Sequence, residues 1–400
     1  MNVRLIQFVP ETLPTHRPDV QALFARYLPR LGIRNDIVGY AAGAPAPDWG
    51  GGDCVAVGAG RGKLGAHLHF AATLLKAGLD RRYDVLQVRD MVWAGALGLL
   101  LARLSGKRFC YWMSFLMSES RMRRARDRSE SVAAWKRPLL FAKGWLEYQL
   151  LYRLILPLAD HVFTQSDAMR DYVAGRGIAA ARLSAVPMGV DLERVAAVTP
   201  QRWPGWPAGS EGPVVCYLGA LDRLRGLEVL IDAIAQLQAA VPGVRLLLIG
   251  DGSHPPERAF LERRAAELGI AGLVCVTGWL PSERAWSLVA GCDLALSYVP
   301  RGFLFDVSSP TKLAEYLSIG MPSVANDSPD QAAVLGDSER GWLTDGTASG
   351  FVKSITFALH EPDIARLRAA DGRAYIEQHR SYARLAEGVA AIYFRLAGAQ

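Results

Sequence analysis

The segment FDVSSPTKLAEYLSIGMPSVAND, residues 305–327, carries the clearest local structural signals in the chain. Its Ser-Ser-Pro turn is typical of a helix start, and Gly320 is placed to end that helix before a short apolar strand at residues 323–325. A helix N-terminus offers free backbone N–H groups and the positive end of the helix dipole, which together favour a phosphate. Lys312 and Glu315 follow about one turn apart. The pattern predicts either a capped surface helix with an ordinary ion pair or a helix that faces a phosphorylated ligand.

Strands alternate with amphipathic helices along most of the chain. In the first half we expect strands near residues 3–9, 36–40, 54–57, 85–88, 108–113 and 161–164, and helices near 19–31, 63–77 and 92–104. The stretch TPQRWPGWPAGSEGP, residues 199–213, breaks this periodicity as a linker does, and the alternation resumes from Val214 to about Ile355. Such alternation predicts parallel sheets with right-handed crossovers, in which ligands bind beyond the carboxyl ends of the strands.

The composition fits a protein of two α/β domains. A chain of 400 residues is long enough for two cores, and half of its residues are hydrophobic, as buried parallel strands require. The five cysteines are scattered without a metal-binding spacing, which indicates a reducing compartment. The N-terminal segment MNVRLIQFVP reads as a first strand, and no apolar run reaches the ~20 residues of a membrane span. We expect a cytoplasmic protein, either soluble or peripheral on the cytoplasmic face of a membrane.

The order of several motifs resembles that of one known family. From Pro213 to about Asp345 the chain is similar to the C-terminal half of glycosyltransferase family 4, the group 1 glycosyl transferases, which are retaining enzymes of the GT-B fold. The matching blocks are VVCYLGALDRLRGLEVLIDAIA (214–235), VRLLLIGDGS (244–253), LVCVTGWLP (273–281), CDLALSYVP (292–300) and SPTKLAEYLSIGMPSVANDSPDQ (309–331). Upstream, DHVFTQSDAMRDYV (160–173) and VPMGVD (186–191) also resemble family elements. Over the first 110 residues the resemblance rests on the alternation of strands and helices alone.

The resemblance implies an α/β GT-B architecture, in which two Rossmann-like, doubly wound domains face a central cleft. It assigns an acceptor-side domain to residues 1–198, a linker to 199–213 and a nucleotide-sugar-binding domain to 214–375. A C-terminal helix at 376–400 is expected to return to the N-terminal domain.

The donor of such an enzyme is a nucleoside diphosphate sugar, so its site needs positive charge. Arg223 and Arg225 follow the strand at 214–218, where guanidinium groups could grip a diphosphate with two hydrogen bonds each. The family carries an Arg and a Lys in this turn, and Ala220 stands near the position of the Arg. We therefore assign the role of the Lys, as a catalytic cation, to Arg225 and the displaced Arg role to Arg223. The alternative is two solvated arginines on a surface turn.

Glycines and one aromatic residue complete the expected nucleotide contacts. Gly219 ends a strand where phosphates would come close to the backbone, and a side chain there would hinder their approach. Gly250 follows the strand at 244–249 in a Gly-Asp-Gly element, and the place of this element in the family's order of motifs makes Gly250 an expected substrate contact. The segment Thr277 to Leu280 resembles the family's nucleobase pocket, so Trp279 and Leu280 are expected to line it. The alternative for Trp279 is packing at a strand end.

An acidic pair in the family contacts the sugar and the ribose of the donor. Its two glutamates stand eight positions apart, and Glu315 matches the one that binds the ribose. The other falls at Val307, which cannot accept a hydrogen bond, so the neighbouring Asp306 is our substitute for the contact with the transferred sugar.

The start of the same helix offers further phosphate contacts. Ser308, Ser309 and Thr311 present hydroxyl and backbone N–H groups, which bind phosphate or cap the helix, and the two roles are compatible. Lys312 either lies toward the phosphates or forms a structural pair with Glu315.

A catalytic histidine is missing from its usual place. Many relatives carry a histidine after a mid-domain strand, but the corresponding FCYWMSF (109–115) contains none. His16, in the first strand-to-helix loop, is the substitute we name as a catalytic candidate, because the family commonly has a Gly-Gly pair where this chain has His16 and Arg17. The alternative is a solvated loop histidine.

Residues 118–157 combine a basic run with an aromatic and apolar one. Residues 118–137 hold seven Lys or Arg against three Asp or Glu, and WKRPLLFAKGWLEYQLLYRLILP follows from residue 135. Such a segment suits either an anionic membrane surface or a solvated helix next to a core helix. We expect no nucleic-acid binding, because no recognised module accompanies the charges.

The function implied is transfer of a sugar, with retention, from a nucleoside diphosphate sugar to a carbohydrate or lipid-linked acceptor in cell-surface polysaccharide or glycolipid synthesis. No cofactor or metal is expected, because arginines, backbone amides and a helix dipole balance the diphosphate charge. Two alternatives stay open, a catalytically silent nucleotide-sugar-binding partner subunit and a sugar-nucleotide epimerase of the same fold.

Overall fold

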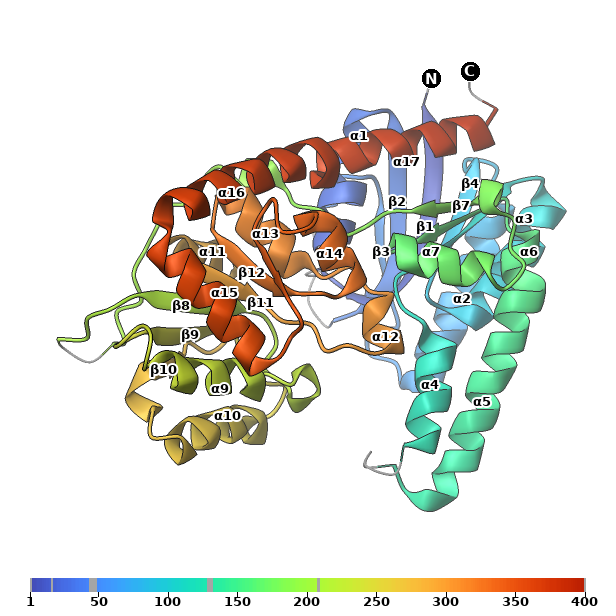
Figure 1. Cartoon of the computed structure of the whole chain (residues 1–400). Helices are drawn as coiled ribbons and strands as arrows, with labels where there is room; N and C mark the ends of the chain where they lie inside the picture. The colour runs from blue at the N-terminus through green and yellow to red at the C-terminus, as the bar shows by residue number, and fades with distance from the viewer. Residues whose placement is uncertain (1, 16, 43–48, 128–131, 207–208, 399–400) are drawn as a thin grey trace. The chain divides into compact units, whose positions relative to one another are not determined.

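A computed structural model describes the chain except for residues 1, 16, 43–48, 128–131, 207–208 and 399–400. The chain forms two compact units, one of Met1–Pro187 with Tyr382–Gln400 and the other of Met188–Ser381 (Figure 1). Residues 188–198, expected in the first domain, belong to the second unit. The reason is local packing, since Val190 pairs with Ser381 through the backbone and Val195 is buried in one cluster with Leu313.

The first unit is built on a seven-stranded sheet in the order β3-β2-β1-β4-β5-β6-β7, and every pair is parallel. Its strands are β1 (Val3–Leu13), β2 (Ile33–Ala41), β3 (Cys54–Val57), β4 (Val85–Arg89), β5 (Arg108–Met113), β6 (His161–Thr164) and β7 (Leu183–Ala185). The strand order reverses between β1 and β4, which makes the carboxyl end of this pair the natural ligand-binding edge of the sheet.

Helices cover this sheet, and their ends follow recognisable sequence signals. They are η1 (Asp19–Tyr27), α1 (Leu28–Arg30), α2 (Lys63–Leu79), α3 (Val92–Ser105), α4 (Met117–Arg126), η2 (Ala134–Lys136), α5 (Arg137–Leu150), η3 (Leu151–Ile155), α6 (Leu156–Leu158), α7 (Asp167–Ala174) and η4 (Ala180–Arg182), where η marks 3₁₀ or π segments. Helix α3 is followed by Gly106, its C-cap, in the left-handed conformation. Helix α7 begins at Ser166, whose hydroxyl accepts a 3.0 Å hydrogen bond from the Met169 N–H.

The C-terminal helix α17 (Tyr382–Leu396) belongs to the first unit although its residues come last in the chain. One face of the helix is apolar, and Tyr382, Val389 and Tyr393 are buried there in a cluster with Phe24 and Trp112. The Tyr393 hydroxyl donates a 2.6 Å hydrogen bond to Gln87 on β4. The helix therefore completes the core of this unit.

The second unit contains a six-stranded parallel sheet in the order β10-β9-β8-β11-β12-β13. Its strands are β8 (Val214–Leu218), β9 (Arg245–Ile249), β10 (Val274–Val276), β11 (Leu294–Ser297), β12 (Ser323–Asn326) and β13 (Trp342–Thr344). Strands β9 and β11 are buried along their whole length, as expected for parallel strands covered on both faces. The order reverses between β8 and β11.

The helices of the second unit are α8 (Leu192–Val195), η5 (Arg223–Arg225), α9 (Glu228–Leu237), α10 (Pro255–Glu267), η6 (Ala271–Leu273), α11 (Ser282–Ala290), α12 (Phe303–Asp306), α13 (Thr311–Ile319), α14 (Pro329–Leu335), α15 (Ala348–His360), α16 (Pro362–Tyr375) and η7 (Ile376–Arg380). Helix α13 is the helix of the segment 305–327, and it ends at the left-handed Gly320.

The stretch at 199–213, expected to be a linker, is packed against the second unit where it is described. The Gln201 N–H donates to the Ser287 carbonyl at 2.8 Å, and the Trp203 indole donates to the Cys275 sulfur at 3.1 Å. Two tryptophans, Trp203 and Trp206, pack against the same apolar cluster. All five cysteines have free thiols. Among the described helices, none has the length and apolarity to cross a membrane.

Candidate functional site

The candidate site lies at the carboxyl edge of the sheet in the second unit, where β8, β9 and β11 end. Gly219 follows β8 and Gly250 follows β9, with φ angles of +146° and +142°. A Cβ on Gly250 would lie 2.0 Å from the Gly219 carbonyl oxygen, so only glycine fits there. The Gly219 N–H donates to the Ile249 carbonyl at 3.0 Å. The two strand ends therefore meet backbone to backbone, with no side chain between them.

Lys312, in the first turn of α13, lies over the end of β8. A Cβ on Gly219 would be 3.6 Å from the Lys312 Cε. The buried ammonium donates to the Tyr298 carbonyl at 3.2 Å and lies 4.8 Å from the centre of the Tyr217 ring. Burial, reinforced by the nearby Arg225, lowers the pKa of Lys312 to about 7. Lys312 therefore lies over the strand end and also interacts with Glu315, whose carboxyl group favours the ammonium, so both roles considered for Lys312 stay predictions.

The two arginines of the turn after β8 have different surroundings. Arg225 lies 6.0 Å from the centre of the Phe305 ring, and no carboxylate of the described residues forms an ion pair with it. Arg223 is exposed and turned toward α10, where its N–H donates to Glu257 at 2.8 Å and its guanidinium lies 4.6 Å from the centre of the Phe260 ring. Arg225 and Lys312 thus form the cationic part of the edge, and Arg223 has partners of its own.

Glu315 lies one turn further along α13. Burial raises the pKa of Glu315 to about 7, while the Lys312 ammonium and a hydrogen bond with Trp286 act in the opposite direction. Trp286 in turn stacks under Arg194, whose guanidinium is 5.3 Å from the ring centre. A half-buried carboxyl group in these surroundings can accept a hydrogen bond from a ligand hydroxyl.

The hydroxyl groups before α13 are engaged within the protein. Ser308 donates to the Phe305 carbonyl at 2.6 Å. Ser309 is buried, accepts from the Met188 N–H at 3.0 Å and donates to Asp330 at 3.0 Å. Asp330 also pairs with the buried Arg380 at 2.8 Å. Ser309 therefore joins three distant parts of the unit, while Thr311 is half-buried at the first position of the helix.

The remaining predicted residues lie around this edge. Asp306 pairs with Arg301 at 2.8 Å, and Arg301 also pairs with Asp327 at 2.9 Å. Trp279 follows β10 and is 71% exposed, which leaves its ring open to stacking, while Leu280 packs on the apolar core. His16 falls outside the described residues.

A second polar cluster, missed by the sequence reasoning, occupies the corresponding edge of the first unit. It consists of Glu11, Arg17, Asp19, Arg89, Asp90 and Ser114, which follow or end β1, β4 and β5. Arg89 is fully buried, pairs with Asp19 and stacks 5.4 Å from the centre of the Trp112 ring. Arg17 pairs with Glu11 and Asp19, both at 3.2 Å. The charged pair Arg-Asp directly after the apolar strand 85–88 was the available signal.

Charge balance controls this second cluster. Burial opposes ionisation, yet Arg89 and Arg17 hold the pKa of Asp19 below its usual value. Burial raises the pKa of Asp90, even though Arg89 and hydrogen bonds from Ser114 favour its carboxylate. Asp90 has a φ of +51°, a conformation that costs a non-glycine residue energy. The Asp90 N–H donates to the Trp112 carbonyl at 3.0 Å, and the Asp90 carboxylate accepts from the Ser114 N–H at 2.8 Å.

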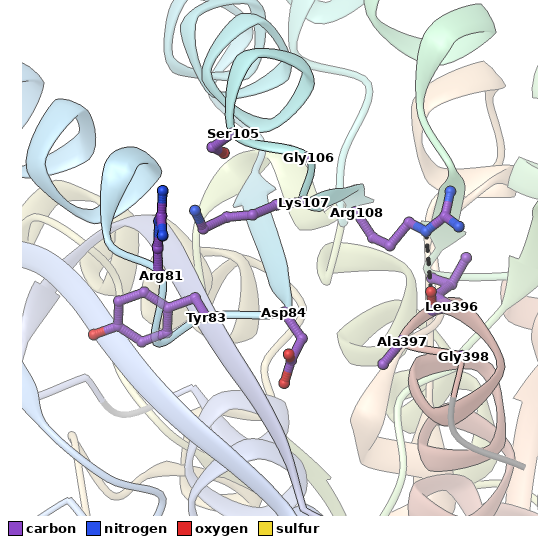
Figure 2. A pocket seen from close by; sticks show the side chains of 10 residues that line it. All are labelled: Arg81, Tyr83, Asp84, Ser105, Gly106, Lys107, Arg108, Leu396, Ala397 and Gly398. Carbon is purple, nitrogen blue, oxygen red and sulfur yellow. Dashed lines mark hydrogen bonds between the residues drawn. The ribbon is translucent and has the colours of Figure 1, made fainter.

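A hollow of about 530 Å³ in the first unit lies at the opposite, amino edge of the sheet. Figure 2 shows Arg81, Lys107 and Arg108 along its wall, between the end of α3 and the end of α17. Lys107 donates to the Gly78 carbonyl at 2.9 Å, and Arg108 donates to the Leu396 carbonyl at 3.0 Å. Because these carbonyls belong to helix C-termini, the two cations cap helices, and the hollow is not the candidate donor site.

Two family models and several known proteins match parts of this chain. The family described as glycosyl transferases group 1 matches residues 204–375, and the glycosyl transferase 4-like domain matches residues 20–189. The lipopolysaccharide core biosynthesis glycosyltransferase LpsE of Rhizobium meliloti is 32% identical over 36% of this chain and 39% of that protein. A GDP-mannose-dependent phosphatidylinositol monomannoside mannosyltransferase of Mycolicibacterium smegmatis is 29% identical over 54% of this chain and 57% of that protein. The chain thus matches about half the length of these relatives or less.

Solved structures resemble the chain over almost its whole length. Anabaena HepE in complex with UDP has a TM-score of 0.71 at 15% identity and covers 98% of this chain and 99% of its own. A glycosyltransferase from Rickettsia africae has a TM-score of 0.74 at 14% identity and covers 99% of this chain and 98% of its own. At these identities the likeness concerns the fold, two parallel-sheet α/β units of the GT-B type.

Proposed function

Because the chain belongs to the group 1 glycosyl transferases and has their GT-B fold, we propose that it moves a sugar from a nucleoside diphosphate sugar to a carbohydrate or lipid-linked acceptor. The observation that carries the proposal is the edge formed by Gly219, Arg225 and Lys312. Lys312 lies beside the bare backbone of Gly219, and Arg225 is near enough to lower the pKa of Lys312, so a diphosphate would supply the negative charge and the close approach that this arrangement accommodates.

Each donor group has a counterpart at this edge. Arg225 and Lys312 face the diphosphate, and the backbone at Gly219 and Gly250 admits it closely. Glu315 accepts a hydrogen bond from a ribose hydroxyl, and Trp279 stacks on the base. The proposal needs no metal, since the arginine and lysine side chains balance the charge. Two similar proteins support the proposal that the donor is a nucleoside diphosphate sugar. Anabaena HepE was solved with UDP-glucose, and a mycobacterial relative is named as GDP-mannose-dependent.

The proposed reaction retains the configuration of the anomeric carbon. The bond between that carbon and the diphosphate oxygen breaks, and the acceptor oxygen bonds to the same face of the sugar. The proton of the acceptor hydroxyl passes to the departing diphosphate oxygen, so no protein nucleophile is needed. The protein then accelerates transfer by positioning both substrates and by stabilising the leaving diphosphate through Arg225 and Lys312.

The acceptor side is assigned to the first unit. A lipid-linked acceptor would require a peripheral location on a membrane surface. Residues 118–157 are proposed to contribute to it, since α4 carries exposed Arg123 and Arg126 and α5 exposes Trp145. Within the basic segment Arg121 pairs with Glu147, and the cations of Arg126 and Lys136 lie over the rings of Phe141 and Trp135.

A catalytically silent nucleotide-sugar-binding subunit is the second candidate. It is favoured by Val307, which is buried where the family has a glutamate, and by the pairing of Asp306 with Arg301. An epimerase of the same fold would use the same donor edge.

One experiment separates these functions. Nucleotide sugars are first screened by thermal shift, because a ligand at 100 times its Kd adds ~2.7 kcal/mol to stability. The best donor is then incubated with the pure protein, with and without acceptor, and the products are followed by NMR. A glycoside of unchanged anomeric configuration supports the proposal, and an inverted one contradicts retention. Binding without turnover identifies the silent subunit, and a changed sugar nucleotide without acceptor identifies an epimerase.

A further inference from the structure

Two neighbouring helices of the first unit expose rows of large apolar side chains. Along α2 the row consists of Leu64, Leu68, Leu75 and Leu79, which are 74%, 63%, 48% and 56% exposed. Along α3 it consists of Trp93, Leu100 and Leu104, which are 41%, 55% and 72% exposed. Within each row the spacing of four or seven residues keeps the side chains on one helical face. Scattered exposed leucines are ordinary, but an ordered row of them is not.

The two rows belong to one surface, which we name the α2–α3 face. The Trp93 ring lies 5.6 Å from Phe70 and 6.2 Å from His67, both on α2. Further along, a Cβ on Gly78 would lie 2.7 Å from the Leu101 side chain of α3. The helices therefore pack against each other at both of these points, in the part of the first unit labelled α2 and α3 in Figure 1.

The charges that border the α2–α3 face are mainly positive. Helices α2 and α3 contain no Asp or Glu, whereas Lys63 and Lys76 are exposed on α2 and Arg61 is exposed just before it. The rows end beside the hollow of Figure 2, where burial lowers the pKa of the Lys107 ammonium, Asp80 opposes this shift and Arg81 adds to it. Cations therefore border both ends of α2, and Asp80, the carboxylate that directly follows the helix, is paired with Arg82.

We propose that the α2–α3 face is the surface by which the protein docks on an anionic lipid bilayer. Leucine and tryptophan side chains enter the boundary between headgroups and acyl chains, and the bordering Lys and Arg side chains contact anionic headgroups. The positive charges bordering the face favour an anionic bilayer over a second copy of the chain as its binding partner. A symmetric dimer through this face would bring cations against cations with no carboxylate of α2 or α3 to compensate them, whereas an anionic bilayer supplies the opposite charge.

This inference deepens the proposed function, and in that respect it rests on it, because a docked first unit would meet a lipid-linked acceptor at the bilayer. The surface differs from the arginine run of α4, since it is formed by other helices and its central side chains are apolar. Binding through it should therefore keep a substantial salt-resistant part, whereas binding through arginines alone weakens as salt screens their charges.

The test is co-sedimentation of the full chain with vesicles of phosphatidylcholine that contain or lack phosphatidylglycerol. The double variant Leu68→Glu, Leu75→Glu should lower the partition coefficient on anionic vesicles more than about tenfold, because it removes two apolar contacts and adds two negative charges. Leu367→Glu is the matched control, since this leucine of α16 is 64% exposed in the other unit. It should pellet like the wild type.

Three results would overturn the proposal. They are equal pelleting of the double variant and the wild type, equal binding to vesicles with and without phosphatidylglycerol, and a wild-type dimer in light scattering that the double variant converts to a monomer. The variant Arg123→Ser, Arg124→Ser, Arg126→Ser should lose less binding than the leucine variant, and a larger loss would assign docking to α4. Thermal-shift binding of the donor should be equal in all variants. If no variant binds donor, the proposed function fails, while the vesicle result still decides the docking surface.

Discussion

The carboxyl edges of the two sheets share one topology and differ in how their charges are balanced. In the first unit, where the order reverses between β1 and β4, the carboxylates of Asp19 and Asp90 surround the buried Arg89. In the second unit, where it reverses between β8 and β11, Arg225 and Lys312 lie near each other and Lys312 has a lowered pKa. At the first edge both arginines form ion pairs with carboxylates, whereas at the second edge Glu315 acts on Lys312 and Arg225 forms no ion pair among the described residues.

The difference shows how one architecture serves two purposes. Buried charges that compensate each other contribute to a defined local structure, and removing one partner is costly because the other stays buried and charged. Cations held close together without matching carboxylates are unfavourable until an anion arrives. We therefore expect substitutions at the first edge to lower stability and substitutions at the second edge to lower donor affinity.

The largest effect is expected for Arg89→Met. This change leaves Asp19 and Asp90 buried without their shared cation, so the free energy of unfolding should fall by about 3–5 kcal/mol. Urea denaturation followed by tryptophan fluorescence measures it, with the first transition analysed separately because the chain has two units. Arg170→Met, which removes exposed pairs with Asp167 and Asp171, is the control and should cost under ~1 kcal/mol. Equal stability of both variants would show that the first edge is not held by its charges.

Arg225→Ala should weaken binding of the donor by about 10- to 100-fold, the loss of one charge-assisted contact, without lowering the melting temperature. Arg223→Ala is the matched control two residues away, and it should change donor affinity little because Arg223 is turned toward Glu257 and Phe260. Calorimetric titration with nucleotide sugar gives both values. If Arg223→Ala proves the more damaging, the cationic edge has been assigned to the wrong arginine.

Glu315→Gln should weaken binding of the donor by ~1.5–3 kcal/mol at a pH where the carboxylate is ionised. The reason is that a charged acceptor of a hydrogen bond is replaced by a neutral one. The fold should persist because the side chains have the same shape. Binding of the diphosphate nucleotide should be compared with binding of the free diphosphate. Only the nucleotide has a ribose, so an equal loss for both would contradict the assigned contact.

The smallest effect is a pH dependence. Because the pKa of Lys312 is about 7, its ammonium becomes neutral above that pH and its contribution to donor affinity should fall, by up to about tenfold, as pH rises from ~6.5 to ~8.5. Glu315, whose pKa is also about 7, ionises over the same range, so the decline is measured as the difference between the wild type and Lys312→Arg. Bound diphosphate favours the ammonium, so binding near pH 8 should take up protons, which titration in two buffers of different ionisation enthalpy detects. Lys312→Arg stays charged throughout this range and should lose the decline. An equal pH dependence in the wild type and in Lys312→Arg would show that Lys312 does not face the diphosphate.

Several elements could be predicted from the sequence because their signals are local. The expected strands at 54–57, 108–113, 161–164 and 214–218 coincide with β3, β5, β6 and β8, and helix α3 ends one residue beyond its expected limit. Gly320 ends α13 in the left-handed conformation, as its position after the apolar pattern suggested. In each case the periodicity of apolar residues and a terminating glycine lie within a few residues of each other.

Other features depended on residues far apart in the chain. Asp19 and Arg89 are 70 residues apart, and their pairing follows only from the parallel neighbourhood of β1 and β4. Ser309 was expected at a phosphate or a helix cap, but it contacts Asp330 and Met188, the latter 121 residues away. The apolar faces of α2 and α3 could be recognised from their composition, yet which leucines stay exposed was settled by what packs against the helices.

The sequence by itself determined the alternation of strands and helices, the glycines at strand ends and the family. Each of these features depends on residues that are close together in the sequence. Only the tertiary structure decided which charges compensate each other. It turned Arg223 toward α10, placed Lys312 over Gly219 and enclosed Arg89 among carboxylates. The physical reason is that electrostatic energy depends on distance and burial in three dimensions, and strands that are remote in sequence set both when the sheet forms.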